Sequence, residues 1–394
     1  MSKARLQTST VHTPPPTTNP QDIGSFTYGD AFLKYHIYHN ATMDAYTTVV
    51  PPQYRGQKIA EKLCDAAYKY AMEQGYNVLP TCSYIASRYI PNNIDTVGKN
   101  SLLGYDSQTE GLEISVTHGG VAICRFTEPR RRNPLTKVIL EKMYAFLTQC
   151  GNMEINDDDG QGRSQAPVKV LRIESTGPCF SSGHDFKDLG GATREAQKEV
   201  LDICSAVNLK LKAIPQISIA CVAGAALAGG MQMLSSCDLV MAHKEKATFC
   251  LPGTRGRGFC HTPSVSVAER VMSTRKAFEL AILSEEIDAI EAEKIGLVNK
   301  IFNTDEEFRN GVEDVCNRLT RWFGPNMVNG KKTFYQMIEG GSTEEKYKIA
   351  TGPMLDMFQS NLQKRTMLEF ADGTRKKRKE AQRLAKLANN KSSK

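Results

Sequence analysis

The sequence predicts an α/β protein in which a domain of parallel strands and helices follows a small α+β domain. Residues 169–189 and 217–238 each read as a buried strand, a glycine-containing turn and the start of a helix. Repeated units of this kind turn in one direction, which favours parallel sheets arranged as a spiral. The length of 394 residues is also more than one average domain needs.

The first 22 residues are expected to be disordered or to act as a targeting segment. They carry Lys3 and Arg5, many Ser and Thr residues, and no acidic residue before Asp22. This composition fits a weak mitochondrial transit peptide, whereas the three prolines at 14–16 disfavour an amphipathic helix. Both alternatives stay open at this stage.

Residues 23–95 are predicted to form the small α+β domain. Two strand-like runs, 32–38 and 43–50, flank a turn and precede a helix from residue 59 that Gly75 closes. Residues 77–79 return to a strand, and a short helix over 83–89 is expected to end before Pro91.

This order, with the segments VPPQYRGQ and PTCSYIASRYI, resembles the core of small GNAT acetyltransferases. In that family an Arg/Gln-x-x-Gly-x-Gly/Ala turn holds the pyrophosphate of acetyl-CoA on backbone N–H groups at a helix N-terminus. The resemblance implies such a site at Arg55, Gly56 and Ala60. Lys58 stands at the family's central glycine, where it adds charge but adopts a left-handed turn less readily than glycine.

A polar, turn-rich stretch, residues 96–110, is predicted to link the small domain to a larger one over 111–373. The larger domain is expected to open with a hairpin of residues 112–116 and 121–126, followed by an arginine-rich turn and a helix to about residue 148. Helices are expected to fill its C-terminal part. A basic tail, residues 374–394, completes the chain.

The glycine-rich stretch 217–238 is a candidate functional element. Gly224, Gly229 and Gly230 allow backbone N–H groups to approach an anion or a polarised carbonyl closely, although they could equally serve only tight packing. The earlier stretch, 169–189, adds a second strand-to-turn element. Two such elements can supply two donors to one oxygen, as an oxyanion hole requires.

The segments FSSGHDFKDL and AGAALAGGMQMLSSCD resemble, in order and spacing, the two signature segments of the crotonase (enoyl-CoA hydratase/isomerase) superfamily. The resemblance covers about residues 110–373 and is strongest to the enoyl-CoA hydratase domain-containing proteins assigned to mitochondria. It implies a ββα spiral, a coenzyme A thioester as substrate in fatty acid or acyl-CoA metabolism, and a homotrimer or hexamer. In such assemblies the last helices, here 321–370, cover a neighbouring subunit.

The resemblance also implies roles for individual residues. The backbone amides of Ser181 and Gly229 would form the oxyanion hole. Further contacts to coenzyme A would come from the first signature segment, at Phe180, Ser182, Gly183 and Asp185. The arginines at 130–132 would lie near the phosphates.

Both glutamates that move protons in the family are replaced, by Gln232 and Gly253. An amide cannot act as a base and glycine has no side chain, so both changes count against hydratase chemistry. His261 is a candidate substitute base, with a structural hydrogen bond as the alternative. The chain is therefore expected to be an acyl-CoA enzyme, a non-catalytic acyl-CoA-binding or regulatory protein, or an acetyltransferase through its N-terminal domain.

Charge and cysteine content restrict the possible partners. The net charge is +7, and residues 371–394 carry nine Lys or Arg against two acidic residues, so the body is near neutral and is not expected to bind nucleic acid. The tail favours a nuclear or cytosolic alternative to mitochondria, or a solvated helix end. Eleven cysteines without CxxC spacing predict no metal site and a reducing compartment, and no apolar run is long enough to predict membrane contact.

Overall fold

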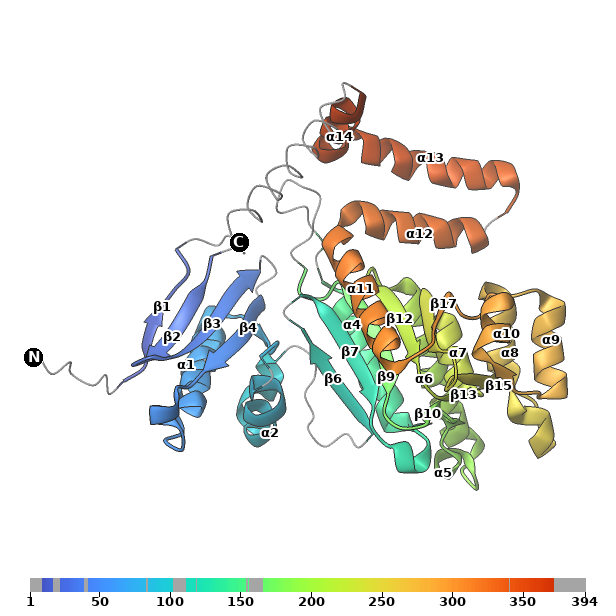
Figure 1. The fold of residues 1–394 in the computed structure, drawn as a ribbon, viewed down its shortest axis with the longest axis horizontal. Helices are drawn as coiled ribbons and strands as arrows, with labels where there is room; N and C mark the ends of the chain where they lie inside the picture. Colours follow the sequence, from blue (N-terminus) through green and yellow to red (C-terminus); the bar gives the residue numbers. More distant parts are fainter. Residues whose placement is uncertain are drawn as a thin grey trace, which may run out of the picture. The chain divides into compact units, whose positions relative to one another are not determined.

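The computed structural model describes most of the chain (Figure 1). The described residues are 9–16, 22–38, 42–82, 84–101, 111–117, 119–153, 155, 166–339 and 341–371. The predicted basic tail and most of the predicted linker lie outside these ranges. The chain divides into two compact units, and the second comprises, among the described residues, 155 and 322–371.

The N-terminal region, residues 9–101, contains a five-stranded sheet in the order β1-β2-β3-β4-β5. The strands are β1 (Val11–Thr13), β2 (Gly24–Tyr28), β3 (Ala31–Tyr38), β4 (Thr42–Val49) and β5 (Asn77–Leu79). Only β5 is parallel to its neighbour. Helix α1 (Ile59–Gln74) contacts β2 to β5 and ends at the predicted Gly75, which has a left-handed conformation. The predicted strands β3, β4 and β5 are confirmed.

Strand β1 lies within the segment expected to be disordered, so that expectation is wrong for residues 11–13. The His12 ring stacks on Phe26 at a centroid distance of 4.3 Å, and its Nε2 atom lies 2.6 Å from the Tyr35 hydroxyl. These contacts come from residues distant in sequence. A three-residue strand of this kind therefore leaves no periodic signal.

The N-terminal region extends to Ser101, beyond the predicted start of the linker at residue 96. A π-helical turn (Ile85–Tyr89) continues into α2 (Ile90–Asn92), and α3 (Ile94–Val97) and a 3₁₀ turn (Gly98–Asn100) follow. The expected helix end before Pro91 is therefore wrong. The Ser101 hydroxyl lies 2.9 Å from that of Tyr68, and Ser101 bridges to Val78, so these residues pack onto the small domain.

The larger region is built on a six-stranded sheet in the order β17-β14-β12-β9-β7-β6 (Figure 1). The strands are β6 (Leu112–Val116), β7 (Val121–Phe126), β9 (Val170–Ser175), β12 (Ile217–Val222), β14 (Leu239–His243) and β17 (Lys300–Phe302). The predicted hairpin β6–β7 is antiparallel, and every other pair is parallel. All six residues of β12 are buried, as expected for a central parallel strand.

Three strands of this sheet each continue into a strand of a second sheet and then into helices. The second sheet has the order β10-β13-β15-β16 and contains β10 (Cys179–Ser181), β13 (Ala225–Leu227), β15 (Thr248–Cys250) and β16 (Ile287–Asp288). A two-stranded pair joins β8 (Pro134–Leu135) to β11 (Gly183–His184). Because β9, β12 and β14 lead into β10, β13 and β15 in turn, the fold is the predicted ββα spiral.

Helices surround and extend these sheets. In chain order they are α4 (Lys137–Gly151), α5 (Phe186–Leu189), α6 (Arg194–Ala213), α7 (Gly229–Ser236), α8 (His261–Arg270), α9 (Thr274–Leu283), α10 (Ala289–Lys294) and α11 (Asp305–Trp322). Short 3₁₀ turns occur at Pro52–Tyr54, Pro129–Arg131 and Pro252–Gly256. Helix α7 begins at Gly229 within the predicted strand–turn–helix segment, and all of its eight residues are buried.

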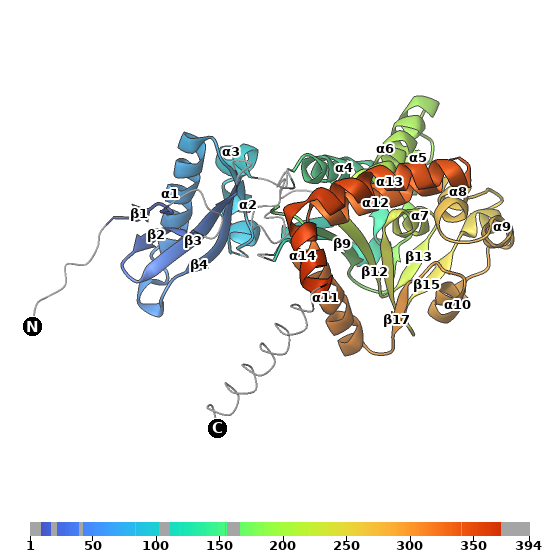
Figure 2. The ribbon, with the colours of Figure 1, turned by 90° about the horizontal axis from the view of Figure 1, so that it is seen from above.

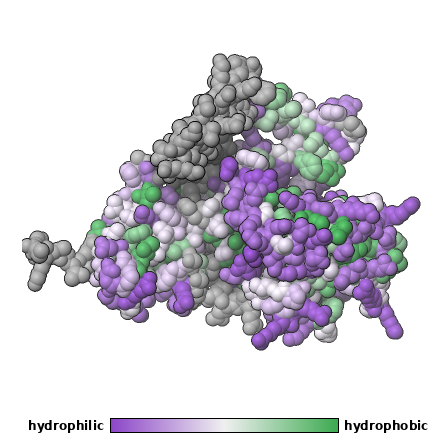
Figure 3. All heavy atoms as spheres, viewed as in Figure 1, coloured by the Kyte–Doolittle hydropathy of each residue, from purple (hydrophilic) through white to green (hydrophobic). Residues whose placement is uncertain are grey.

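The C-terminal helices are α12 (Pro325–Glu339), α13 (Thr343–Gln359) and α14 (Asn361–Ala371), and α12 runs beside α13 (Figures 1 and 2). They expose large apolar side chains, among them Phe334, Tyr347 and Leu355. Hydrophobic atoms are accordingly visible on the C-terminal helices in Figure 3. The packing of this region against a neighbouring subunit stays a prediction. None of the helices in the described ranges is long and apolar enough to span a membrane.

Candidate functional site

The two glycine-containing segments meet in the larger region. Strand β10 pairs in parallel with β13, with Ser181 opposite Ala226. A Cβ atom placed on Gly183 would lie only 2.7 Å from the Gly229 nitrogen, and one placed on Gly230 would lie 2.6 Å from the Ser181 carbonyl oxygen. Glycine at both positions therefore lets the turn after β10 contact the start of α7.

The start of α7 presents a backbone donor at this meeting point. Ala228 has the unusual backbone angles φ 45° and ψ −116°, and its N–H donates to the Cys250 carbonyl at 3.0 Å. The first helical bond runs from the Gln232 N–H to the Ala228 carbonyl at 3.1 Å. Gly229 therefore lies in the first turn, where N–H groups have no helical acceptor and where the helix dipole favours negative charge.

Among the amide nitrogens of the first segment, that of His184 lies nearest to the side-chain position of Gly229. A Cβ atom on Gly229 would lie 3.5 Å from the His184 nitrogen. The preceding amides are used internally, because Ser182 N–H donates to the Arg132 carbonyl (2.9 Å) and Gly183 N–H donates to the Ser181 hydroxyl (3.1 Å). The choice of Ser181 as a donor stays a prediction; His184, which directly follows Gly183, is a residue that the sequence did not single out and whose amide nitrogen lies beside Gly229.

The imidazole of His184 is held in its neutral form. Burial lowers the pKa of His184, because a charged ring would lose its hydration. Its Nε2 atom is enclosed and has no hydrogen-bond partner within the described residues. The ring therefore adds no positive charge to the site at neutral pH.

Three other predicted contact residues have internal roles. Phe180 is fully buried and packs edge-on against Phe126 at 5.9 Å. Ser182 anchors the turn through its amide, as described above. The Asp185 carboxylate caps α5 by accepting from the Lys187 N–H (3.0 Å) and forms an ion pair with Arg131. Their contact with coenzyme A, and that of the arginine-rich turn, stays a prediction.

Neither Gln232 nor Gly253, where the sequence predicts that the family's two glutamates are lost, carries an acid. Gln232 is 5% exposed, and its Oε1 atom accepts from the Cys204 thiol (3.6 Å) and the Thr262 hydroxyl (3.4 Å). At Gly253 a Cβ atom would lie 2.6 Å from the Cys260 nitrogen and 2.8 Å from the Phe259 carbonyl carbon. The backbone at Gly253 therefore leaves no room for a side chain of any kind.

The candidate base His261 is exposed at the first residue of α8. Its Nδ1 atom lies 3.1 Å from the Phe259 carbonyl oxygen, and the two rings are 5.1 Å apart. This contact matches the structural alternative that the sequence left open. A role for His261 as a base stays a prediction.

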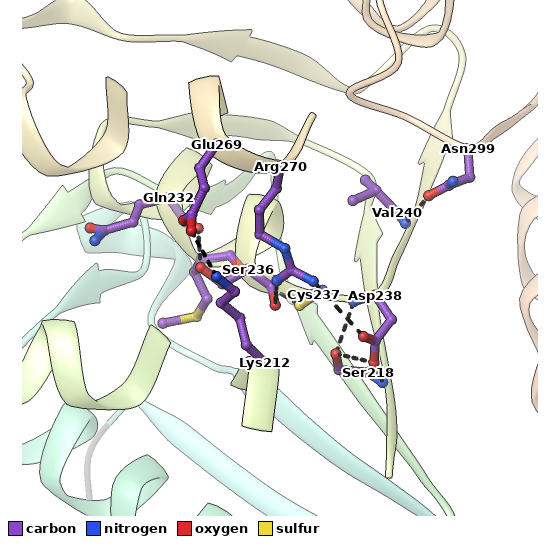
Figure 4. A network of polar contacts seen from close by, with 11 residues as sticks. Lys212, Ser218, Gln232, Ser236, Cys237, Asp238, Val240, Glu269, Arg270 and Asn299 are labelled. Carbon is purple, nitrogen blue, oxygen red and sulfur yellow. Dashed lines mark hydrogen bonds and ion pairs between the residues drawn. The ribbon is translucent and has the colours of Figure 1, made fainter. Parts of the chain in front are cut away.

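The far end of α7 is fixed by a buried polar network (Figure 4). Asp238 accepts hydrogen bonds from the Ser218 amide (2.7 Å) and hydroxyl (2.9 Å), which join the end of α7 to β12. Arg270 of α8 donates to the Ser236 carbonyl and lies 4.0 Å from the Asp238 carboxylate. This network holds α7, and with it Gly229, against the sheet.

A second candidate site lies in the N-terminal region, in a cavity of about 440 Å³ at the start of α1. The cavity is lined by Thr48, Val50, Tyr54, Arg55, Gly56, Lys58, Ile59, Ala60, Glu61 and Tyr84. The three predicted residues Arg55, Gly56 and Ala60 are therefore together. Lys58 adopts the left-handed conformation (φ 56°, ψ 26°) that the sequence indicated would be harder for it than for glycine.

Within the described ranges, no group of three or more His, Cys, Asp or Glu side chains is placed to hold a metal ion. The eleven cysteines are all free thiols, and ten of them are buried. They behave as small apolar residues of the core.

Two family models match this chain. Residues 117–380 match the model described as enoyl-CoA hydratase/isomerase, and residues 26–96 match the model described as GCN5-related N-acetyl-transferase. The first covers the spiral with Gly183 and Gly229, and the second covers the N-terminal cavity.

Several known proteins are similar over the larger region. Rat "enoyl-CoA hydratase domain-containing protein 3, mitochondrial" is 31% identical over 238 residues, which are 60% of this chain and 74% of that protein. The crystal structure of human enoyl coenzyme A hydratase domain-containing protein 3 aligns with a TM-score of 0.59 and 27% identity, covering 67% of this chain and 98% of that one. A 4-chlorobenzoyl coenzyme A dehalogenase of Arthrobacter sp. is 28% identical over 246 residues, which are 60% of this chain and 82% of that protein.

Proposed function

The chain belongs to the enoyl-CoA hydratase/isomerase family, and from this premise we propose that it binds an acyl-CoA thioester with the carbonyl oxygen between the amides of Gly229 and His184. The observation that carries the proposal is the close approach of the two segments: only glycine fits at residue 183, because a Cβ atom there would lie 2.7 Å from the Gly229 nitrogen. We place His184 where the sequence predicted Ser181, because the His184 nitrogen is among the atoms nearest to the side-chain position of Gly229.

Two N–H groups directed at one oxygen stabilise the negative charge that a polarised thioester or an enolate carries there. The dipole of α7 adds to this effect at its N-terminus. Loss of a single donor in such a site typically costs about 3–4 kcal/mol of transition-state stabilisation. The neutral ring of His184 leaves this role to the backbone.

Proton transfer is the step that this site supports least. Hydration of a double bond needs a group that activates water and a group that protonates carbon. Gln232 supplies a neutral amide, and Gly253 supplies nothing and is surrounded by backbone atoms. The function that the geometry supports best is therefore acyl-CoA binding with a polarised thioester, rather than hydration by two glutamates.

Binding and turnover of crotonyl-CoA test this function. Calorimetry is expected to detect binding, and loss of enoyl absorbance is expected to be slower than with a two-glutamate family member by roughly 10²–10⁴ for each absent group. Hydration at the rate of that reference enzyme would show that the two replacements are not limiting. An absence of any acyl-CoA binding would overturn the proposal itself.

Acetyl-CoA binding by the N-terminal cavity is a second candidate function. The cavity brings Arg55 and Gly56 to the start of α1, where N–H groups favour a phosphate. Titration of the full chain with acetyl-CoA is expected to give a stoichiometry near two ligands per chain. The Arg55→Ala variant is expected to lower it to one. Lys69→Ala, which removes an exposed cation elsewhere on α1, is expected to leave it unchanged. An unchanged stoichiometry in Arg55→Ala would refute this second site.

The names of the similar rat and human proteins include the word mitochondrial. They support a mitochondrial location for this chain as part of the proposal. A contribution of the basic tail to a cytosolic or nuclear location stays an alternative.

A further inference from the structure

A buried asparagine joins the arginine-rich turn to the junction of β9 with β10. Asn133 is 1% exposed and lies directly before β8. Its Nδ2 atom donates to the carbonyl oxygens of Thr176 (3.0 Å) and Cys179 (2.6 Å). Its Oδ1 atom accepts from the Glu128 N–H at 2.8 Å. The side chain thus uses both of its donor hydrogens and its acceptor, and all three partners are backbone groups.

The backbone at Asn133 has a conformation that few residue types adopt. Its φ is 50°, and the preceding Arg132 has a φ of 63°. These two left-handed residues connect the 3₁₀ turn Pro129–Arg131 to β8. Asparagine tolerates this conformation better than most residues, because its short polar side chain can bond to nearby backbone groups. Asn133 therefore combines the required backbone conformation with three buried hydrogen bonds.

The strand that follows this asparagine holds the segment that carries the His184 amide. In the parallel pair of β8 and β11, Leu135 lies opposite His184. The Leu135 carbonyl accepts from the Asp185 N–H at 3.3 Å, one residue beyond His184. On the other side, the Arg132 carbonyl accepts from the Ser182 N–H at 2.9 Å. The position of β8 and of the residue before it therefore determines where the His184 amide lies.

Asn133 also fixes the strand that leads to the second donor. Cys179 is the first residue of β10, and β10 pairs with β13, which runs into α7 and Gly229. One side chain is thus bonded to β10 while its own backbone continues into β8. The separation between the amides of His184 and Gly229 depends on this link between the two strands.

We propose that Asn133 is a positioning residue of the thioester site. Its side chain holds the His184 amide at the separation from the Gly229 amide at which both can donate to one carbonyl oxygen. Asn133 acts through β8 and β11 and does not touch the ligand. Without its hydrogen bonds the turn is free to shift against β10, and a hydrogen bond weakens steeply when its donor leaves the line to the acceptor. This inference rests on the proposed acyl-CoA binding.

The carbonyl band of butyryl-CoA bound to Asn133→Gly tests this inference. Glycine removes the side chain and adopts a positive φ without strain, so the backbone conformation is retained. In infrared difference spectra, the bound ligand is expected to lose most of the shift to lower frequency that the unmodified chain produces. The dissociation constant is expected to rise by roughly 2–10-fold, which corresponds to one lost net hydrogen bond.

Asn299→Gly provides the matched control. Asn299 lies in the same larger region, and its Oδ1 atom accepts from the Val240 N–H at 2.7 Å (Figure 4). This variant therefore also removes an amide side chain that is bonded to the backbone. It is expected to lower stability without moving the band. Because only the folded chain binds the ligand, the frequency of the bound carbonyl does not depend on the fraction of the chain that is folded.

Asn133→Gly rather than Asn133→Ala carries the test, because alanine would add left-handed strain to the lost hydrogen bonds and risk unfolding. A full shift of the band in Asn133→Gly would overturn the positioning role and leave acyl-CoA binding intact. An equal loss of the shift in Asn299→Gly would overturn it as well. Failure of the unmodified chain to bind butyryl-CoA, or an unshifted band in that chain, would instead overturn the proposed function.

Discussion

Replacing Gly183 with alanine is expected to weaken butyryl-CoA binding by roughly 100-fold or more, because the new methyl group would cover the amide of Gly229. The Cβ atom would lie 2.7 Å from the Gly229 nitrogen and 3.0 Å from the Ala228 Cβ atom. Neither neighbour is the end of a flexible side chain, so the turn and α7 would have to separate. Calorimetric titration of the purified variant measures the loss.

The matched control is Gly191→Ala. Gly191 also has a positive φ (75°, against 85° for Gly183), but no atom lies within 4 Å of its Cβ position. Both variants thus incur about 1–2 kcal/mol of left-handed strain, and only Gly183→Ala obstructs the site. Equal affinities of the two variants would mean that Gly183 does not border the thioester oxygen.

Removing the carboxylate of Asp238 is expected to lower the free energy of unfolding by about 3–5 kcal/mol. The Asp238 side chain is 10% exposed and accepts from both the amide and the hydroxyl of Ser218. Asp238→Ala would leave these donors, and the buried charge of Arg270, without their carboxylate partner. Denaturant unfolding with a fitted slope gives the loss of stability directly.

Asp202→Ala provides the comparison for a surface carboxylate. Asp202 pairs with Lys198 one turn away on α6, and both side chains are more than half exposed. Such pairs contribute about 0–1 kcal/mol, so the control is expected to remain close to the unmodified chain. A similar loss of stability in both variants would show that the network at the end of α7 is no stronger than a surface ion pair.

The sequence allowed much of the fold to be predicted where a local pattern coincided with a structural element. The hairpin of β6 and β7 and the short strand β5 have the predicted bounds, because alternating apolar residues and a glycine turn specify them. Strand β1 could not be found in this way. Its place depends on contacts of His12 with Phe26 and Tyr35, which belong to other strands.

The sequence predicted which two segments form the candidate site, but not which atoms of those segments face each other. The motifs located Gly183 and Gly229, since close backbone approach requires glycine. Which amide of the first segment faces Gly229 depends on the positive φ of Gly183 and on the pairing of β11 with β8, and both are properties of the folded chain. Cys204 lies on α6 and reaches Gln232 only through helix packing.

In the proposed site, the backbone amides of Gly229, at the start of α7, and of His184, in β11, polarise a thioester carbonyl. Infrared difference spectroscopy of bound butyryl-CoA, with and without ¹³C at the carbonyl, tests it most directly, because this saturated ligand cannot be hydrated. We expect the carbonyl band to move to lower frequency on binding to the unmodified chain and to Gly191→Ala. A band at the frequency of free butyryl-CoA, with the ligand demonstrably bound, would contradict the claim.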